Sequence, residues 1–369
     1  MKVVIAGGGT GGHLFPAVAV GDELVRERAD TGVLYVGTSA GFEAKWLPNS
    51  GRRYELLEVH GLRGHSVVER LRATVEFGYA LALSQALLKR EKPDLVVAAG
   101  GYASAPVTVA AIVSRIPIVM MEQNTLPGLS NRLLWRFANK ICVAFSDTKA
   151  YLKTSRVEVT GLPVRYRVNP SELPVSEQIL VLGGSTGAHR LNIGVISAFK
   201  ICANSVINLP VIHQTGEGDV TAIREAYREL PRKAEVAAFI DDVPAALARA
   251  TLVIARSGGG TVCDIALAGR AAIFVPYPFH RDMQQLHNAQ VIERVGGAVV
   301  IRDDQQLAEG LAREIATLIG DRKRREEMGT RARGAMPPDA SRRIAKICFE
   351  VAGVADAGVT VTAAGDLGA

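Results

Sequence analysis

The sequence predicts an α/β protein made of two Rossmann-like domains whose parallel sheets face a cleft, and three observations predict it. Short aliphatic runs alternate with longer helical patterns, which is typical of parallel sheets covered by helices. The segment GGGTGGH at 7–13 returns as GGSTGAH at 183–189, each time between an apolar run and a helical pattern. The 369 residues are enough for two domains with separate cores.

The predicted strands are short aliphatic runs followed by glycine or a polar turn. In the first half they are Val3–Ala6, Val33–Val36, Leu95–Ala99, Ile118–Met120 and Ile141–Ala144. In the second half they are Ile179–Leu182, Val211–Gln214, Leu252–Ala255, Ile273–Val275 and Ala298–Ile301. Ligands of such sheets bind beyond the carboxyl ends of the strands, so we expect the active site between the domains.

The repeat and the composition predict the domain boundaries. We expect an N-terminal domain over 1–162 and a C-terminal domain over 163–340, joined by the proline-containing segment Gly161–Pro174. Residues 341–353 are expected to form a C-terminal helix that could cross back to the first domain. Residues 354–369 are mostly Ala, Gly, Val and Thr, which predicts a disordered tail.

The composition excludes several classes of protein. With 48% hydrophobic and 22% charged residues, the chain fits neither a disordered nor an integral membrane protein. The uncharged stretch Leu95–Ser114 has the length of a membrane span, but glycines and a proline interrupt it, so we expect a strand, a turn and a helix. The apolar run at the amino terminus is too short for a signal peptide. Four widely separated cysteines argue against disulfides or structural zinc and favour the cytoplasm.

The net charge of the chain indicates which kinds of partner it could bind. A net charge of +6 suits an anionic substrate or an anionic membrane surface. Nucleic acid is a poor candidate, because aromatic residues make up only 5% of the chain and the basic run Arg322–Arg333 is interleaved with Glu326 and Glu327.

The first glycine loop favours a ligand at a helix N-terminus. Gly7-x-Gly9-x-x-Gly12 formally matches the dinucleotide fingerprint, but the second strand ends in Val36-Gly37-Thr38, without the acidic residue that would hold a ribose diol. A Walker-type loop is excluded because no lysine follows the glycines. The remaining interpretation is a backbone that a ligand can approach closely, with a tight turn that binds nothing as the alternative.

His13 ends this loop and is our candidate general base. Histidine accepts a proton near neutral pH, and the positive end of a helix favours its neutral form. Local packing or hydrogen bonding of the ring is the alternative interpretation. His189, its counterpart in the repeat, is interpreted as structural.

The second half carries two further loops that suit a diphosphate, GGSTG at 183–187 and RSGGGT at 256–261. Asp264 follows Gly260 by about one helical turn, where a carboxylate could accept hydrogen bonds from a ribose; a capping role is the alternative. Gln284 and Gln285 stand at a predicted helix start and could bind sugar hydroxyls, or could simply be exposed helix residues.

Together these segments resemble one family over nearly the whole chain, to about residue 350: the UDP-N-acetylglucosamine:lipid-linked muramyl-pentapeptide N-acetylglucosaminyltransferases of peptidoglycan synthesis, which convert lipid I to lipid II. The likeness lies in GGGTGGHLFPAVAV at 7–20, GLRG at 61–64, KPDLVVAAGGYASAP at 92–106, EQN at 122–124, GLPVR at 161–165, GGSTGA at 183–188, HQTGEG at 213–218, FIDD at 239–242, RSGGGTVCD at 256–264 and FHRDMQQLHNA at 279–289. The resemblance implies an inverting transferase of the GT-B type, in which the N-terminal domain handles the lipid acceptor at the membrane and the C-terminal domain binds the UDP-sugar.

The resemblance also implies roles for individual residues. Thr10, Gly11 and Gly12 would face the donor and acceptor phosphates, Asn124 would contact the sugar, and Gln284 and Gln285 would serve the N-acetylglucosamine. Uridine and diphosphate would be held by Arg165, Ser185, Ile240, Gly259, Gly260, Thr261, Val262, Cys263 and Asp264. The sequence departs from the family pattern at Met121, Leu162, Thr186, Gly260, Asp264 and Met283.

The reaction implied is attack of the muramyl C4 hydroxyl on the anomeric carbon of UDP-N-acetylglucosamine, with UDP as leaving group. We expect no metal and no cofactor, because no Asp-x-Asp stands in a suitable loop; helix N-termini and Arg165 would stabilise the diphosphate instead. A UDP-N-acetylglucosamine 2-epimerase-like enzyme, or a GT-B transferase with another acceptor, is one alternative. A non-catalytic nucleotide-sugar-binding scaffold is another.

The lipid acceptor implies a peripheral protein at the cytoplasmic face of the cell membrane. Apolar residues recur at helical spacing beside basic ones, a pattern typical of an interfacial helix: Val67, Val68, Leu71, Val75 and Tyr79, with Arg63, Arg70 and Arg72. The alternative is that this stripe is the buried side of an ordinary helix.

Overall fold

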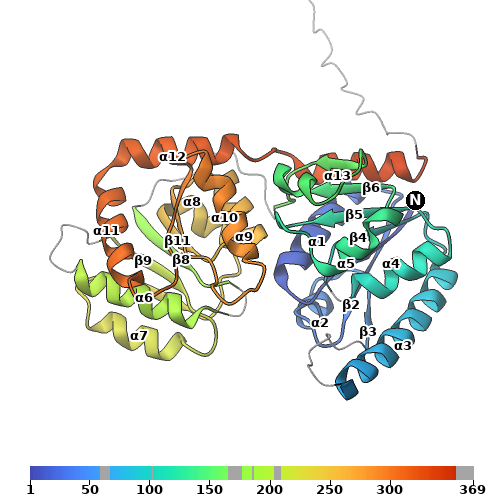
Figure 1. Cartoon of the computed structure of the whole chain (residues 1–369), viewed down its shortest axis with the longest axis horizontal. Coiled ribbons are helices and arrows are strands. Elements are labelled where there is room, and N and C mark those ends of the chain that lie inside the picture. The colour runs from blue at the N-terminus through green and yellow to red at the C-terminus, as the bar shows by residue number, and fades with distance from the viewer. Residues whose placement is uncertain (59–66, 102, 165–176, 185–186, 203–208, 355–369) are drawn as a thin grey trace, which may run out of the picture.

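The computed structural model describes residues 1–58, 67–101, 103–164, 177–184, 187–202 and 209–354, with the backbone alone over 67–73. Figure 1 shows two α/β domains side by side, each with a central sheet covered by helices. The fold class predicted from the alternating pattern is therefore confirmed. The predicted tail, apart from Val354, lies outside the described residues.

The first domain contains a seven-stranded parallel sheet in the order β3-β2-β1-β4-β5-β6-β7. Its strands are β1 (Lys2–Ala6), β2 (Gly32–Thr38), β3 (Tyr54–Leu57), β4 (Leu95–Ala98), β5 (Ile118–Glu122), β6 (Lys140–Val143) and β7 (Val157–Val159). Its helices are α1 (Gly11–Glu27), α2 (Glu43–Trp46), α3 (Val67–Glu91), α4 (Ser104–Val113) and α5 (Leu129–Leu134), with 3-10 turns η1 (Leu47–Asn49), η2 (Trp135–Phe137) and η3 (Ser146–Ala150). Strand β4 and helix α4 account for the uncharged stretch Leu95–Ser114, as predicted.

The second domain repeats the arrangement in six parallel strands, in the order β10-β9-β8-β11-β12-β13. The strands are β8 (Gln178–Leu182), β9 (Val211–Gln214), β10 (Ala234–Ala237), β11 (Ala250–Ala255), β12 (Ala272–Phe274) and β13 (Ala298–Val300). The helices are α6 (His189–Ile201), α7 (Val220–Arg228), α8 (Val243–Arg249), α9 (Gly259–Ala268), α10 (Gln284–Arg294), α11 (Leu307–Gly320) and α12 (Arg322–Gly334).

Three strands were absent from the sequence prediction: β3, β7 and β10. All three are short and stand at the edge of their sheet. An edge strand is not buried on both faces, so it lacks the continuous aliphatic run that marks a central strand such as β4, whose four residues are all buried.

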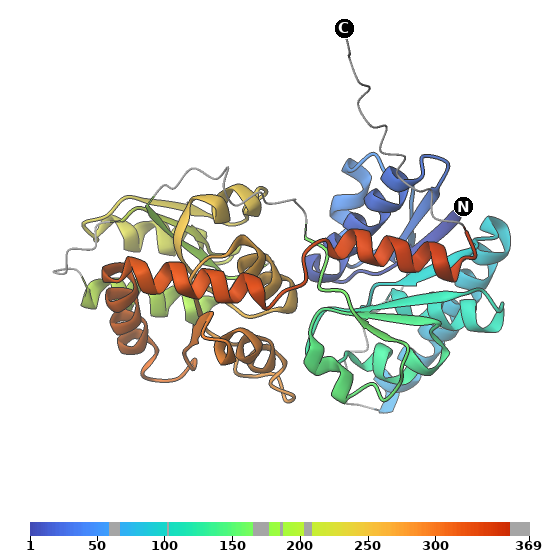
Figure 2. The ribbon, with the colours of Figure 1, turned by 90° about the horizontal axis from the view of Figure 1, so that it is seen from above.

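The last helix, α13 (Ala340–Val351), belongs structurally to the first domain. Figure 2 shows α12 lying over the second domain and α13 over the first. Helix α13 packs on α1, and its Ile344, Cys348 and Phe349 are buried in the cluster that also holds Val3 and Leu14 of the N-terminal domain. Burying these apolar side chains ties the end of the chain to its beginning.

Candidate active site

Four loops stand at the points where the strand order reverses. In the first sheet β1 lies between β2 and β4, and in the second sheet β8 lies between β9 and β11. The loops after β1, β4, β8 and β11 therefore flank the crevices in which doubly wound sheets bind their ligands. Three of these four loops contain the glycine segments that the sequence singled out.

Much of the first glycine loop is already hydrogen bonded within the protein. The amide of Gly7 donates to the Val36 carbonyl (3.1 Å), Gly8 to the Gly100 carbonyl (3.3 Å) and Gly9 to Glu43 Oε2 (2.7 Å). Thr10 is the N-cap residue of α1, and Thr10 and Gly12 are exposed, whereas Gly11 is buried. The helix start at Thr10–Gly12 is thus the part of this loop that remains available to a ligand.

His13 lies half-buried in the first turn of α1. Its Nδ1 is 3.1 Å from Thr10 Oγ1. Burial lowers the pKa of His13 below its usual 6.5, an effect that the nearby Glu43 charge opposes. The ring is therefore neutral at physiological pH, as a general base must be.

The loop after β4 contacts the same ring. A Cβ at Gly100, where φ is +87°, would lie 2.8 Å from His13 Cδ2, and one at Gly101, where φ is +80°, would lie 2.1 Å from the Gly8 carbonyl oxygen. Only glycine permits both this backbone conformation and this approach. The ring is thus held between the two switch-point loops of the first domain.

In the second domain, the loop after β8 is held by amides. Gln214 Nε2 donates to the Gly184 carbonyl (3.1 Å), and the Gly183 amide donates to the Gln214 carbonyl (3.2 Å). Gly187, with φ +78°, packs against the Thr215 carbonyl oxygen, 2.4 Å from the position of a Cβ. Ser185 and Thr186, two residues of the predicted cradle, lie outside the described residues, as does Arg165.

The loop after β11 leads into the N-terminus of α9. The buried Arg256 donates to Asp303 Oδ2 (2.8 Å) and to the Val275 carbonyl (3.0 Å), which anchors the loop. Substituents at Gly258 and Gly260 would meet nothing within 4 Å, so the start of α9 is open at these two positions. An open helix N-terminus after a parallel strand suits an anion.

Along α9 the predicted binding residues fall into two groups. Thr261 and Asp264 are half-buried, whereas Val262 and Cys263 are fully buried in the domain core. Burial raises the pKa of the Cys263 thiol, which lies 3.9 Å from the Met336 sulfur. Any ligand contact by Val262 or Cys263 must therefore use the backbone. Ile240, after β10, is half-buried against the same core.

The two domains meet through the start of α9 and through α10. Asn288, fully buried, donates from Nδ2 to Asn124 Oδ1 (3.0 Å), and its Oδ1 accepts from the Thr125 amide (2.8 Å). A Cβ at Gly259 would lie 1.9 Å from the Gln123 carbonyl oxygen, so the backbones touch there. Phe42 and Phe239 add a contact between rings whose centroids are 6.1 Å apart.

The adjacent glutamines have different surroundings from those the sequence predicted. Gln284 Nε2 donates across the domain boundary to the Leu126 carbonyl (3.1 Å). Gln285 Oε1 accepts from the amides of Ser257 (3.2 Å) and Tyr277 (2.9 Å), so this oxygen holds the loop after β11. A sugar hydroxyl could then meet only the Nε2 group of Gln285.

Asn124 is positioned by a buried carboxylate. Glu122 accepts from the Asn124 amide (2.9 Å), from the Gly128 amide (2.9 Å) and from Asn131 Nδ2 (2.8 Å). Burial raises the pKa of Glu122 despite these hydrogen bonds. The loop after β5 is thereby fixed at the domain boundary.

Sequence reasoning assigned no role to Glu43 or Asn288, and it included Ser257 in a predicted diphosphate loop without a role of its own. Asn288 carried a usable signal, because it follows Gln284 by four residues and shares its helix face. Nothing in the sequence pattern around Glu43 distinguished it from a solvated helix residue.

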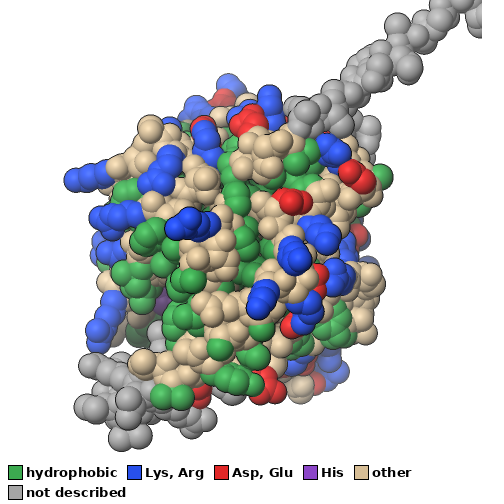
Figure 3. All heavy atoms as spheres, turned by 90° about the vertical axis from the view of Figure 1, so that its right-hand side faces the viewer, with side chains coloured by type: hydrophobic (Ala, Val, Ile, Leu, Met, Phe, Trp, Pro, Cys, Tyr) green, Lys and Arg blue, Asp and Glu red, His purple; other side chains and the backbone are tan. Residues whose placement is uncertain are grey.

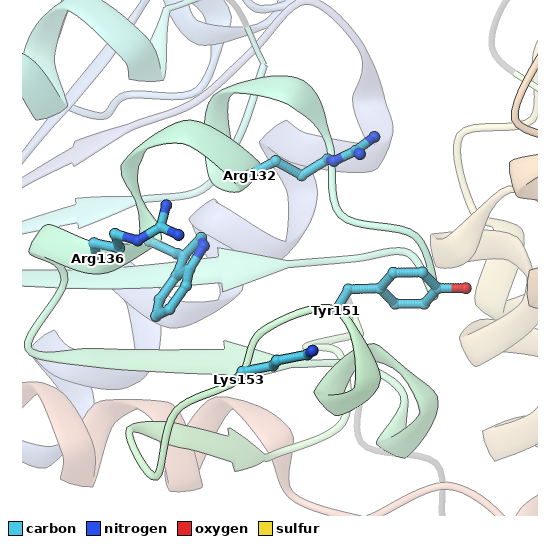
Figure 4. A pocket seen from close by; sticks show the side chains of 5 residues that line it. Arg132, Arg136, Tyr151 and Lys153 are labelled. Atoms are coloured by element: carbon cyan, nitrogen blue, oxygen red, sulfur yellow. The ribbon is translucent and has the colours of Figure 1, made fainter.

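Away from these loops, the first domain has a surface depression of about 370 Å³ lined by Arg132, Trp135, Arg136, Tyr151 and Lys153. Arg136 lies over the Trp135 ring, 4.8 Å from its centroid. Figure 4 shows that the charged ends of Arg132, Arg136 and Lys153 do not converge on one point. In the described part of the chain, no group of three or more His, Cys, Asp or Glu residues could hold a metal ion.

Two Rossmann-like domains whose switch-point loops meet at a shared boundary form the GT-B type of fold. Residues 3–143 match the glycosyltransferase family 28 N-terminal domain, and residues 178–344 match the glycosyltransferase family 28 C-terminal domain. The chain belongs to glycosyltransferase family 28.

Relatives share nearly the whole length. A protein of Geotalea uraniireducens named UDP-N-acetylglucosamine–N-acetylmuramyl-(pentapeptide) pyrophosphoryl-undecaprenol N-acetylglucosamine transferase is 37% identical over 352 residues, which cover 93% of this chain and 96% of that protein. A Solibacter usitatus protein of the same name is 39% identical over 354 residues, covering 95% and 96%. The family resemblance drawn from the motifs is thus confirmed.

Solved structures agree with this assignment. The crystal structure of Acinetobacter baumannii MurG is 30% identical, with a TM-score of 0.74, and covers 95% of this chain and 99% of that one. A putative UDP-N-acetylglucosamine 2-epimerase from Listeria monocytogenes has a TM-score of 0.68 at 15% identity, over 96% and 98% of the two chains, and shares the fold alone.

Proposed function

We propose that the protein transfers N-acetylglucosamine from UDP-N-acetylglucosamine to the muramyl C4 hydroxyl of a lipid-linked muramyl pentapeptide, inverting the α donor to a β-1,4 link. One observation carries the proposal. Gln123 lies between the candidate base and the candidate donor site. Its Oε1 and His13 Nε2 both lie beside Gly100, and its carbonyl oxygen contacts Gly259 at the start of α9. A neutral histidine and an open helix N-terminus therefore flank one point of the domain boundary.

The chemistry follows from these groups. As the acceptor oxygen bonds to the anomeric carbon, its proton passes to His13 and the bond to UDP breaks. The leaving diphosphate gains negative charge. The N-terminus of α9 and that of α6, which follows the loop after β8, are suited to stabilise this charge, and Arg165 and Ser185 are further candidates. Asp264, about one turn along α9, is the candidate for the ribose, and Gln285 for the sugar.

The acceptor carries a lipid, and the exposed apolar residues of the first domain support a peripheral place at the cytoplasmic face of the membrane. None of the helices described is long and apolar enough to cross a bilayer. Val75 and Tyr79 on α3 are 66% and 55% exposed, which removes the buried-stripe alternative for these two. Val67, Val68, Leu71, Arg70 and Arg72 have no described side chains, and Arg63 lies outside the described residues.

A second apolar stripe lies on the same side of the sheet. Leu129, Leu133 and Phe137, each four residues apart, are 55–66% exposed, with Arg132 and Arg136 between them. Helices α3, α4 and α5 pack in succession. Figure 3 looks onto this end of the molecule and shows hydrophobic side chains interspersed with Lys and Arg and with fewer Asp and Glu side chains. Apolar side chains among basic ones suit an anionic lipid surface.

Cosedimentation with anionic vesicles tests the membrane face. Val75→Glu combined with Leu133→Glu should leave the melting temperature unchanged, because both side chains are exposed, and should weaken vesicle binding by about 10-fold. Ile201→Glu, at an exposed residue of α6 in the other domain, is the matched control. Unchanged binding by the folded double variant would contradict the proposed face.

Labelled UDP-N-acetylglucosamine with a lipid I analogue tests the transfer itself. We expect a β-1,4-linked product, formation of UDP and undiminished activity in excess EDTA. Consumption of the sugar nucleotide without acceptor would indicate the epimerase-like alternative. Binding of the nucleotide without turnover would indicate a scaffold, and loss of activity in EDTA that magnesium restores would reject stabilisation by helix N-termini.

A further inference from the structure

Glu43 is a fully buried carboxylate at the start of α2 that the proposed reaction does not yet use. Its Oε2 accepts from the Gly9 amide at 2.7 Å. Its Oε1 accepts from both the amide and the hydroxyl of Thr38, each at 2.7 Å. Both oxygens are therefore engaged, and the side chain links the end of β2 to the glycine loop after β1.

The space for this side chain is made by glycines from three segments. A Cβ at Gly8 or Gly41 would lie 2.2 Å from Glu43 Oε1, and a Cβ at Gly37 would lie 2.3 Å from Glu43 Cγ. Any side chain at these positions would collide with Glu43. The surrounding backbone thus leaves room for this carboxylate and supplies its hydrogen-bond donors. A buried charge without these donors would be costly.

The contact between Glu43 and Gly9 is one residue away from Thr10, which contacts the candidate base. Thr10 follows Gly9 in the chain, and the Thr10 hydroxyl is 3.1 Å from His13 Nδ1. A basic Nε2 requires the ring proton on Nδ1, where it is donated to Thr10 Oγ1. The orientation and the tautomer of the ring thus depend on where the glycine loop holds Thr10.

We propose that Glu43 is a positioning residue for the transfer: by holding Gly9, it fixes the Thr10 hydroxyl that orients His13. The inference rests on the proposed function, in which His13 takes the acceptor proton. Glu43 touches neither the ring nor a substrate in this role. It acts through the backbone of the glycine loop.

Glu43→Gln is the discriminating variant. A glutamine can accept hydrogen bonds at one oxygen only, so either the Gly9 amide or the Thr38 amide loses its acceptor, while the volume is kept. A base displaced by a fraction of an ångström lowers kcat, and we expect a loss of about 10- to 100-fold. KM for UDP-N-acetylglucosamine should stay nearly unchanged, because the donor loops lie in the other domain.

The pH profile supplies a readout that a purely structural role would not move. Around the His13 ring, α2 contributes the charged Glu43, while the loops after β4 and β5 contribute the uncharged Gly100 and Gln123. Loss of the negative charge removes an effect that raises the pKa of His13. The acid limb of kcat/KM should therefore move to lower pH in Glu43→Gln.

Glu23→Gln is the matched control, because Glu23 is also a buried acid of the same domain, on α1, and pairs with Arg26 instead of the loop. It should retain kcat to within roughly twofold. If Glu43→Gln does not fold, Thr38→Val removes one of the three donors, and a smaller loss of kcat in the same direction is expected. A folded Glu43→Gln enzyme with unchanged kcat and pH profile would overturn the inference.

Hydrogen exchange separates this inference from the proposed function. The peptide that covers residues 7–14 should exchange faster in Glu43→Gln than in Glu23→Gln, whatever reaction the enzyme catalyses. Wild-type protein without transferase activity would reject the proposed function. Equal exchange in the two variants would reject the role of Glu43.

Discussion

The first and second domains place a glycine loop at the same topological point but hold it with opposite chemistry. In the first domain the buried carboxylate of Glu43 accepts from the loop amide of Gly9. In the second domain the neutral amide of Gln214 donates to the loop carbonyl of Gly184. The repeat seen in the sequence is therefore a repeat of the backbone path and not of the electrostatic surroundings.

This difference assigns the loops to different tasks. A loop in which one amide, that of Gly9, already binds a buried carboxylate is a poor place for a diphosphate, but it can position a neutral base. The loop after β8 is held by the neutral amide of Gln214, which places no negative charge beside an anion. We infer that the first loop serves the acceptor hydroxyl and that the loops after β8 and β11 serve the donor.

Replacement of the base should have the largest effect. His13→Ala removes the group that accepts the proton, and a missing general base lowers kcat by ~10²–10⁴-fold. Binding of UDP, measured by calorimetry, should be nearly unchanged, because the donor loops are in the second domain. A fully active variant would show that another group takes the proton and would end the division of tasks between the loops.

Making the second loop resemble the first should weaken donor binding. Gln214→Glu places a carboxylate beside the Gly184 carbonyl and near the expected diphosphate, and like charges at such a contact should raise Kd for UDP about 10- to 100-fold. Gln305→Glu makes the same charge change at an exposed turn and should leave Kd unchanged. Equal affinity in both variants would place the diphosphate elsewhere.

A methyl group at the domain boundary tests whether the loops must approach one another. Gly259→Ala would place its Cβ 1.9 Å from the Gln123 carbonyl oxygen, so the two loops must separate. We expect a loss of kcat of about 10-fold or more. Gly320→Ala, at the end of α11 in the same domain and with nothing within 4 Å of the new atom, is the control. Similar activity of both variants would argue that this contact does not position the reactants.

The pH profile should show the smallest effect over the physiological range. Burial lowers the pKa of His13, and a base is active when unprotonated, so kcat/KM should fall only as the pH drops through a value below 6.5. Between pH 6.5 and 8 no acid limb is expected. An acid limb centred above pH 6.5 that disappears in His13→Ala would contradict a lowered pKa of His13. It would mean that the surroundings stabilise the protonated ring more than burial destabilises it.

Local patterns were enough to propose part of the site. His13 was proposed as the base because a strand, a glycine loop and a helix start follow one another directly in the chain, and the same order marked Gly259 and Gly260 as candidates. Glu43 was missed because it lies 34 residues from Gly9 in the chain and meets it only in the folded protein. Asn288 lies in a quoted motif, yet its contact with Asn124 joins residues 164 positions apart.

The alternation of aliphatic runs and helices by itself determined two parallel sheets and hence which loops lie at the ligand-binding edge. Such patterns suffice because strand and helix preferences are local and parallel topology follows from them. The tertiary structure alone decided which amides and side chains remain for a ligand. It engages Gly9 with Glu43, Gln285 with Ser257, and the side chains of Val262 and Cys263 with the core. Hydrogen bonding and burial depend on proximity in space, which residues distant in sequence acquire only when the chain is folded.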